Sequence, residues 1–255
     1  MKIAIITWAS SGLWKAFLQL LNSKNDIDEI RALARNKNNL EKLRKTYWDK
    51  IKPYPIDISD KNQILKFSES LSKEKPNIKF LINNAGYGKF CSYEDLSIED
   101  SINMIDLNVS WVVSMWLICI PYMKKDSYII NIASVASFQP LPYMNIYAAT
   151  KSFVKSYSRA LNIELKKNWI KVTAVCPSWI QTNFFERWEI WAKVAPRKYE
   201  NIVSPEFVAK KALNDALKWK DISIPWWYAN VLHIIASILP DNLIMKWRLK
   251  QQGIR

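Results

Sequence analysis

The sequence predicts an α/β protein built on a doubly wound parallel sheet, and two observations support this fold class. Short apolar runs rich in Ile and Val alternate with longer amphipathic segments from the first residue to about residue 225. No linker, low-complexity tract or internal repeat interrupts that alternation. Strands separated by helices at this spacing are typical of a parallel sheet with helices on both faces.

Each element is predicted from its own pattern. The expected strands are the short apolar runs Lys2–Ile6, Glu29–Ala34, Ile51–Ile56, Ile78–Ile82, Ser127–Ala133, Lys171–Cys176 and Ile222–Pro225. The expected helices are the amphipathic segments Leu13–Leu21, Asn39–Tyr47, Asn62–Ser72, Ile98–Met123, Tyr147–Lys167 and Pro205–Leu217. We expect one domain over residues 1–225 and a C-terminal helical extension over 226–255.

Composition excludes several classes of protein. The chain has 255 residues, 49% of them hydrophobic and only three of them cysteine, which argues against disorder and against a disulfide scaffold. No signal peptide is recognised, and the apolar run Val231–Leu239 is too short to span a membrane, so a cytoplasmic protein is expected. The net charge of +14 comes mostly from scattered lysines, which is typical of a solvated surface and not of a nucleic-acid interface.

Two loops follow predicted strands at the edge of the sheet where ligands bind in such folds. The first, Thr7–Trp14, places serines and Gly12 between a strand and a helix, where backbone N–H groups can face an anion. The second, Asn83–Gly86, combines side-chain amides with small residues that suit close packing against a cofactor. Each loop also has a purely structural explanation, as a helix cap or as a strand-ending turn.

A third group carries acid–base chemistry. Ser134 ends a buried strand, and Tyr147 and Lys151 follow four residues apart on one face of a predicted helix. A free tyrosine titrates too high for catalysis at neutral pH, and a neighbouring ammonium is expected to lower its pKa. Ser134 could hold a carbonyl oxygen within reach of Tyr147. No cluster has metal-ligand spacing, so no metal is expected.

Together these motifs resemble the short-chain dehydrogenase/reductase family, over about residues 2 to 225. The resemblance implies a Rossmann fold, NAD(P) binding and a catalytic tetrad of Asn108, Ser134, Tyr147 and Lys151. It also implies that the asparagine helps to hold a water chain leading to the lysine. The cofactor contacts expected from the matching positions are Thr7, Trp8, Ser10, Ser11, Gly12, Leu13, Arg35, Asp57, Ile58, Asn84, Ala85, Gly86, Pro177, Ile180 and Thr182, together with Tyr147 and Lys151.

The cofactor preference depends on the residues that follow the second strand. A carboxylate there would bind the ribose diol of NAD, whereas this chain has Arg35, which can pair with the 2′-phosphate of NADP. We therefore expect NADPH to be favoured over NAD, although Arg35 has a second explanation as a solvated surface charge. Asp57 and Ile58 resemble the family's adenine-contacting pair.

The chain departs from the family pattern in one residue type. Trp8 and Trp14 stand where the family has glycine, and an indole there is expected to collide with the pyrophosphate or the neighbouring strand. The whole sequence has four glycines and 13 tryptophans. Other tryptophans also fall at turn-like places, where glycine is the usual residue, namely Trp48, Trp169, Trp179, Trp219 and Trp226.

Two explanations compete. In one, the protein has lost cofactor binding and is a non-catalytic binding protein of the same fold. In the other, a codon that the source organism reads as glycine has been translated as tryptophan, because UGA is reassigned to glycine in some bacterial lineages and to tryptophan in others. The intact tetrad favours the second explanation. The chain with genuine tryptophans is expected to bind NADPH poorly.

The expected activity is an NADPH-dependent transfer of hydride to or from a hydrophobic carbonyl or alcohol, such as a ketone, a ketoacyl group or a sterol-like molecule. Phe138, Leu141, Tyr143 and Met144 are expected to border the site, and the variable lid Asn183–Lys198 carries further apolar residues. A homo-oligomer is expected. Three roles stay open for Ala229–Lys250: capping the substrate cleft, an oligomer contact, or binding to a membrane surface.

Overall fold

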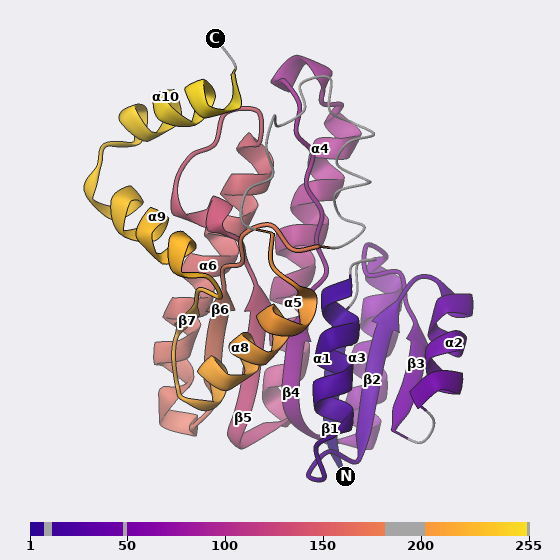
Figure 1. The fold of residues 1–255 in the computed structure, drawn as a ribbon. Helices are drawn as coiled ribbons and strands as arrows, with labels where there is room; N and C mark the ends of the chain where they lie inside the picture. The colour runs from indigo at the N-terminus through magenta and orange to yellow at the C-terminus, as the bar shows by residue number, and fades with distance from the viewer. Residues whose placement is uncertain (8–11, 48–49, 182–201, 254–255) are drawn as a thin grey trace.

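A computed structural model describes residues 1–7, 12–47, 50–181 and 202–253, and its centre is a seven-stranded parallel sheet. The strands lie in the order β3-β2-β1-β4-β5-β6-β7 (Figure 1). The chain adds β2 and β3 on one side of β1 and then crosses back to add β4 to β7 on the other side. The strand bounds are β1 Lys2–Thr7, β2 Glu29–Ala34, β3 Ile51–Pro55, β4 Asn77–Asn83, β5 Met123–Ile132, β6 Lys171–Val175 and β7 Ile222–Ser223.

Helices follow the strands and cover both faces of the sheet (Figure 1). Several begin at a side-chain cap: Asp60, Ser97 and Ser204 each accept a backbone N–H at the start of a helix. The helix bounds are α1 Gly12–Asn22, α2 Lys37–Tyr47, α3 Lys61–Glu74, α4 Ile98–Ile105, α5 Trp111–Cys119, α6 Asn145–Leu165, α8 Pro205–Leu217, α9 Trp227–Ile238 and α10 Asp241–Gln252.

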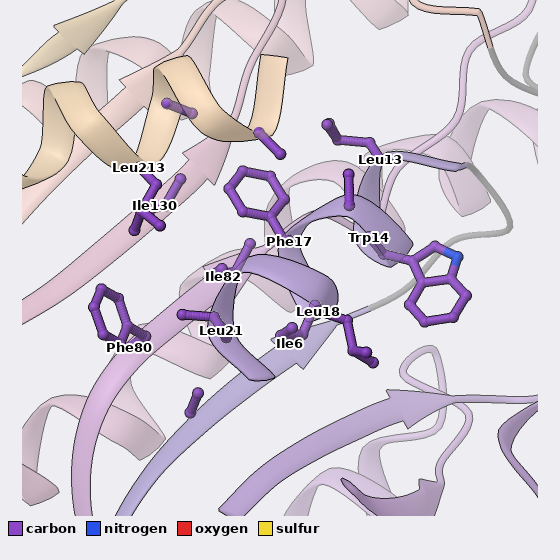
Figure 2. Close-up of a cluster of buried hydrophobic side chains, with 14 of the residues drawn as sticks. Ile6, Leu13, Trp14, Phe17, Leu18, Leu21, Phe80, Ile82, Ile130 and Leu213 are labelled. Carbon is purple, nitrogen blue, oxygen red and sulfur yellow. The ribbon is translucent and has the colours of Figure 1, made fainter. Parts of the chain in front are cut away.

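Strand β1 shows why the sheet has a core on each face. Its residues are apolar in succession, and because side chains alternate along a strand, Ala4 and Ile6 face one core while Ile3 and Ile5 face the other. The first core is formed with α1 and α8, and Figure 2 shows Phe17, Leu18 and Leu21 of α1 in it. The second is formed with α3, α5 and α6.

Helices α4 and α5 form one continuous helical segment, interrupted by a π-helical stretch at Asp106–Ser110. Ile98–Tyr122 is the single helix in the described residues that is long and apolar enough to cross a membrane. However, Trp111, Met115 and Trp116 are fully buried in the second core. The α5 part of the segment therefore packs against the sheet.

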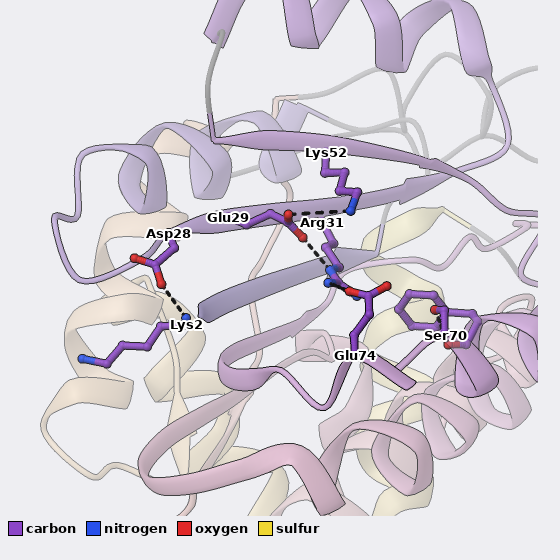
Figure 3. Close-up of polar contacts among 8 residues, drawn as sticks. Lys2, Asp28, Glu29, Arg31, Lys52, Ser70 and Glu74 are labelled. Carbon is purple, nitrogen blue, oxygen red and sulfur yellow. Dashed lines mark hydrogen bonds and ion pairs between the residues drawn. The ribbon is translucent and has the colours of Figure 1, made fainter. Parts of the chain in front are cut away.

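A buried arginine ties β2 to α3 on the second face (Figure 3). Arg31 is fully buried and pairs with Glu29, at 2.7 Å, and with Glu74. Burial lowers the pKa of the guanidinium, but the hydrogen bonds that it donates to the two carboxylates outweigh burial and raise that pKa. Because the two carboxylates compensate its charge, the buried Arg31 has a structural role and joins β2 to α3.

The predicted fold class is confirmed, since the sheet is parallel throughout and is flanked by helices on both faces. The element bounds differ mainly at two places. Strand β5 begins at Met123 and not at Ser127. The C-terminal extension is two helices, because the chain turns at Leu239 and Pro240 before α10. The boundary proposed at residue 225 stays a prediction.

Candidate active site

The carboxyl ends of the central strands bring the sequence-predicted residues to one edge of the sheet. Thr7 ends β1, Asn83 ends β4, and Ser134 and Pro177 lie just beyond β5 and β6. Parallel strands share the edge at which they end, so these four segments lie next to one another. The Val135 amide donates to the Pro177 carbonyl at 3.0 Å and so joins the segment after β5 to the segment after β6.

Thr7 fixes the loop that follows β4. Its hydroxyl is fully buried, accepts hydrogen bonds from the amides of Asn84 (3.1 Å) and Ala85 (3.3 Å), and faces the Ile82 carbonyl at 3.4 Å. The Asn84 Nδ2 atom is buried and has no hydrogen-bond partner among the described residues. An orphaned amide donor at a ligand-binding edge fits a polar group of a cofactor.

Gly86 lies where this loop meets the predicted catalytic residues. A Cβ atom added at Gly86 would lie 3.0 Å from Asn108 Oδ1 and 3.0 Å from Lys151 Nζ. Neither atom can move away easily, because both side chains are buried and hydrogen-bonded. A larger residue here would push against both side chains, so glycine suits the close approach of these three segments.

Asn108 sits in the π-helical stretch between α4 and α5 and is fully buried. Its Nδ2 atom donates to the Tyr87 carbonyl (2.8 Å) and to Thr150 Oγ1 (3.1 Å), and its Oδ1 atom accepts from the Tyr87 amide (3.0 Å). Single π turns inside α-helices recur at functional sites. Asn108 thus links the loop after β4 to α6, the helix that carries the tyrosine and the lysine.

Ser134, Tyr147 and Lys151 come together as the sequence predicted. Each is less than a tenth exposed, and a Ser134 hydrogen bond acts on the Tyr147 phenol. The Lys151 Nζ atom lies 5.9 Å from the centre of the Tyr147 ring and donates to the Ile132 carbonyl at 2.8 Å. The Ser134 hydroxyl also accepts the Ala136 amide at 3.1 Å, which fixes its direction.

The expected lowering of the tyrosine pKa is wrong for this structure. Burial raises the pKa of Tyr147 to about 12, and the Ser134 hydrogen bond opposes the rise. Burial also lowers the pKa of Lys151 to about 8. Desolvation disfavours the charged form of both groups, and it is the largest cause of both pKa shifts.

The sequence missed a buried polar cluster behind the site. Asn131 of β5 accepts from Asn83 Nδ2 (2.8 Å) and from Trp116 Nε1 (3.1 Å), and donates to Ser158 Oγ (2.9 Å). Thr150, which binds Asn108, was missed too. The signal was an asparagine directly after an apolar run in each of two strands, since a buried amide needs partners.

The remaining cofactor positions are spread over several segments of the chain. Arg35 is exposed at the end of β2, and Gly12 and Leu13 open α1. Ile58 is buried in the second core, while Asp57 accepts the Ser59 amide and hydroxyl and so stabilises its own turn. Ile180 forms a bridge with Val203. The last group, Trp8, Ser10, Ser11 and Thr182, lies outside the described residues.

The expected collision of Trp14 with the neighbouring strand is not found. Its side chain is 8% exposed and packs in the first core, at the first turn of α1 (Figure 2). Trp169 and Trp219 do occupy left-handed backbone conformations, with φ of 58° and 63°. Glycine is the residue favoured there. Trp179 and Trp226 are turn-like without a positive φ, and Trp48 lies outside the described residues.

The structure places the four apolar residues expected to border the site in two clusters. Leu141, Tyr143 and Met144 pack in a cluster that includes Tyr147. Phe138 instead faces the C-terminal extension, where its ring lies 4.3 Å from that of His233. The predicted lid Asn183–Lys198 lies outside the described residues. Among the residues that the structure describes, no group of His, Cys, Asp and Glu could hold a metal.

The fold and the site together define a nucleotide-dependent oxidoreductase of the Rossmann type. Residues 2–193 match the family model of the short-chain dehydrogenases, and the chain belongs to this family. It is an NAD(P)-dependent oxidoreductase that acts on alcohol or ketone groups. The resemblance stated from the motifs is thereby confirmed.

Three proteins illustrate the similarity. An uncharacterized oxidoreductase of Staphylococcus epidermidis is 28% identical over 187 residues, which cover 72% of this chain and 80% of that protein. A short-chain dehydrogenase from Streptomyces avermitilis superposes with a TM-score of 0.79 over 99% of each chain at 20% identity, which shows the fold. A serine dehydrogenase complexed with NADP+ superposes with a TM-score of 0.72 at 28% identity, covering 82% of this chain and 86% of that one.

Proposed function

We propose that this protein is an NADPH-dependent reductase of a hydrophobic carbonyl compound. The observation that carries the proposal is the placement of the Tyr147 phenol, hydrogen-bonded to Ser134 and beside the Lys151 ammonium, at the carboxyl edge of the sheet. When bound there, the nicotinamide cofactor supplies the hydride. The chain's own residues must then supply the proton and hold the substrate oxygen.

The proton would come from Tyr147. With its pKa raised to about 12, the phenol is protonated at neutral pH but is a weaker acid than a free tyrosine. It would give its proton to the substrate oxygen as hydride reaches the carbon, because that oxygen then becomes an alkoxide, a stronger base than the phenolate. Ser134 would donate a hydrogen bond to that same oxygen and hold it beside the phenol. Lys151, whose pKa is lowered to about 8, can exchange a proton near neutral pH and so restore the phenol.

The binding of a dinucleotide is supported by the loop after β4. Asn84 offers a buried amide donor with no partner among the described residues, and Gly86 keeps the loop close to Asn108 and Lys151. Arg35, exposed where β2 ends, would pair with a 2′-phosphate, which is the ground for proposing NADPH over NADH. The similar solved structures include a serine dehydrogenase complexed with NADP+ and a ketoacyl reductase complexed with NADH, so the choice rests on Arg35.

The hydrophobic substrate is proposed from the cluster beside the phenol. Phe90 and Tyr143 stack with ring centres 6.2 Å apart, and Leu141 and Met144 pack with them near Tyr147. Such a surface favours an apolar ketone, a ketoacyl group or a sterol-like molecule over a small polar acid. The measurement is NADPH oxidation with a panel of ketones graded by chain length. Activity that rises with apolar length supports the proposal, and activity on short polar ketones alone contradicts it.

We also infer that the positions written Trp8 and Trp14 are glycine in the working protein. The left-handed Trp169 and Trp219 support the inference at two distant sites, because glycine is favoured in that conformation. Codon 8 and codon 14 read as UGA in the gene, with matching peptide masses from the native protein, would establish it. UGG at both codons would overturn it and favour the non-catalytic binding protein.

A further inference from the structure

The C-terminal helix α9 exposes an apolar stripe along its outer side. Val231, Ile234, Ile235 and Ile238 are 40%, 56%, 37% and 72% exposed. They recur every three or four residues, so they share one face of the helix. Leu239 and Leu243 continue the stripe to α10, at 46% and 51% exposed. These six aliphatic residues are called the α9–α10 stripe below.

The opposite side of α9 is already packed. Ala229 is fully buried in a cluster with Ala133 and Cys176, close to the end of β5. The His233 ring lies against Phe138, in the turn that follows Ser134. The stripe is therefore the outer face of a helix that is docked beside the site, and α10 continues over the end of the molecule toward which the strands run (Figure 1).

The charge around the stripe is mainly basic. Residues 222–255 contain four basic residues and a single acidic one, Asp241. Lys246 and Lys250 are exposed on α10, on the helix that carries Leu243. The chain as a whole carries a net charge of +14. An apolar stripe bordered by lysines is complementary to an anionic lipid surface.

The length of α9 decides how it would meet a bilayer. Twelve residues make a helix of about 18 Å, which is well short of the roughly 30 Å hydrocarbon core. The helix would lie in the interface and not cross it. A second copy of the chain is a poorer occupant, because it carries the same basic segment and the same net charge of +14 and so offers the stripe no complementary negative surface.

We propose that the α9–α10 stripe binds this protein to the surface of membranes that contain anionic phospholipid. This goes beyond the oxidoreductase activity and does not depend on it. It also brings the bilayer close to the Ser134 side of the site, where an apolar substrate dissolved in lipid would enter.

The test is sedimentation of the full-length protein with vesicles. We expect binding to mixed phosphatidylglycerol–phosphatidylcholine vesicles, weaker binding at high salt, and little binding to phosphatidylcholine alone. The double variant Ile234→Gln/Ile238→Gln should lower the partition coefficient by roughly tenfold or more, because two exposed isoleucines no longer enter the interface. Lys246→Gln/Lys250→Gln should weaken binding to anionic vesicles only.

The matched controls change the same residue types elsewhere. Ile98→Gln/Ile163→Gln alters two isoleucines that are 80% and 69% exposed on α4 and α6, and it should leave vesicle binding unchanged. Equal loss in both isoleucine pairs would overturn the proposal, as would no binding by the unaltered protein. Sedimentation velocity tests whether a second copy of the chain binds the stripe instead. If the unaltered protein is a dimer that does not bind vesicles, and Ile234→Gln/Ile238→Gln dissociates that dimer, the stripe is a dimer contact and the proposal is wrong.

Discussion

The two halves of the site differ in how well they keep the family pattern. On the proton-transfer side, Asn108, Ser134, Tyr147 and Lys151 are all present, buried and brought together. On the phosphate side, the turn after β1 has tryptophan at both positions 8 and 14 where the family has glycine. A gene losing its function would accumulate changes in both halves. The departures from the family pattern therefore share one residue type, tryptophan, and are not spread over the residues of the active site as a whole.

The largest expected effect tests the intact half. Tyr147→Phe should lower kcat for ketone reduction by roughly 10²–10⁴-fold, because the proton donor is lost while the ring still packs. The measurement is NADPH oxidation in a background with glycine at positions 8 and 14. Tyr157→Phe makes the same change on the same helix, where the ring stacks on Trp116, and should leave kcat unaltered. Equal activity in the two variants would remove Tyr147 from the reaction.

The next effect concerns stability and also belongs to the intact half. Lys151→Met should raise the free energy of unfolding at pH 7 by about 1–3 kcal/mol, because it removes a buried charge whose pKa is held low. Since the folded pKa of Lys151, about 8, is below its ordinary 10.5, the unfolded chain binds more protons between these values. The gain should therefore shrink as pH rises from about 8 to 10.5.

Urea unfolding at several pH values measures this gain. Lys166→Met, on an exposed lysine just after the same helix, is the control and should show no pH-dependent gain. A Lys151→Met protein that is less stable than the unaltered chain at pH 7 would show that the Ile132 hydrogen bond outweighs the cost of burial.

A smaller effect sharpens the phosphate half. Arg35→Gln should weaken NADPH binding by roughly tenfold and leave NADH binding unaltered, because only NADPH carries the 2′-phosphate. Fluorescence titration of the glycine-restored protein with each cofactor gives both affinities. Arg44→Gln, an exposed arginine on α2, is the control. Equal weakening for both cofactors, or for neither, would break the link between Arg35 and cofactor choice.

The smallest effect lies far from the site. Trp169→Gly and Trp219→Gly should each stabilise the protein by about 0.5–1 kcal/mol, because relief of the left-handed strain exceeds the loss of their edge-to-face contact. Thermal unfolding measures it. Trp226→Gly is the contrast: φ is −132° there and the side chain packs on the core, so that variant should be destabilised. Destabilisation in all three would count against glycine at these positions.

Much of the fold and of the catalytic group was predictable from the sequence. Ile3 to Ile6 alternate between two apolar faces, and such runs predict a buried parallel strand without any knowledge of its neighbours. Tyr147 and Lys151 share a helical face by spacing alone. What escaped prediction depends on three-dimensional surroundings. The Tyr147 pKa is raised because the site is buried, and the turn at Pro240 splits an extension that reads as one apolar-to-basic segment.

Contacts between distant segments were equally out of reach. The Asn83–Asn131–Ser158 cluster joins residues up to 75 positions apart, and no local pattern pairs them. Phe138 was expected at the substrate border because it follows Ser134 closely, yet α9 packs against it. Proximity in sequence gave the correct place for Leu141 and Met144 only because that loop folds back over Tyr147.

The most direct measurement of the account is a paired NADPH titration of the chain with tryptophan at positions 8 and 14 and of the Trp8→Gly/Trp14→Gly variant, followed by nicotinamide fluorescence. We expect weak or undetectable binding in the first protein and saturable binding in the second, with Tyr147 and Lys151 unchanged in both. No binding by the glycine variant, although it folds, would contradict the claim that these residues complete a dinucleotide-dependent active site.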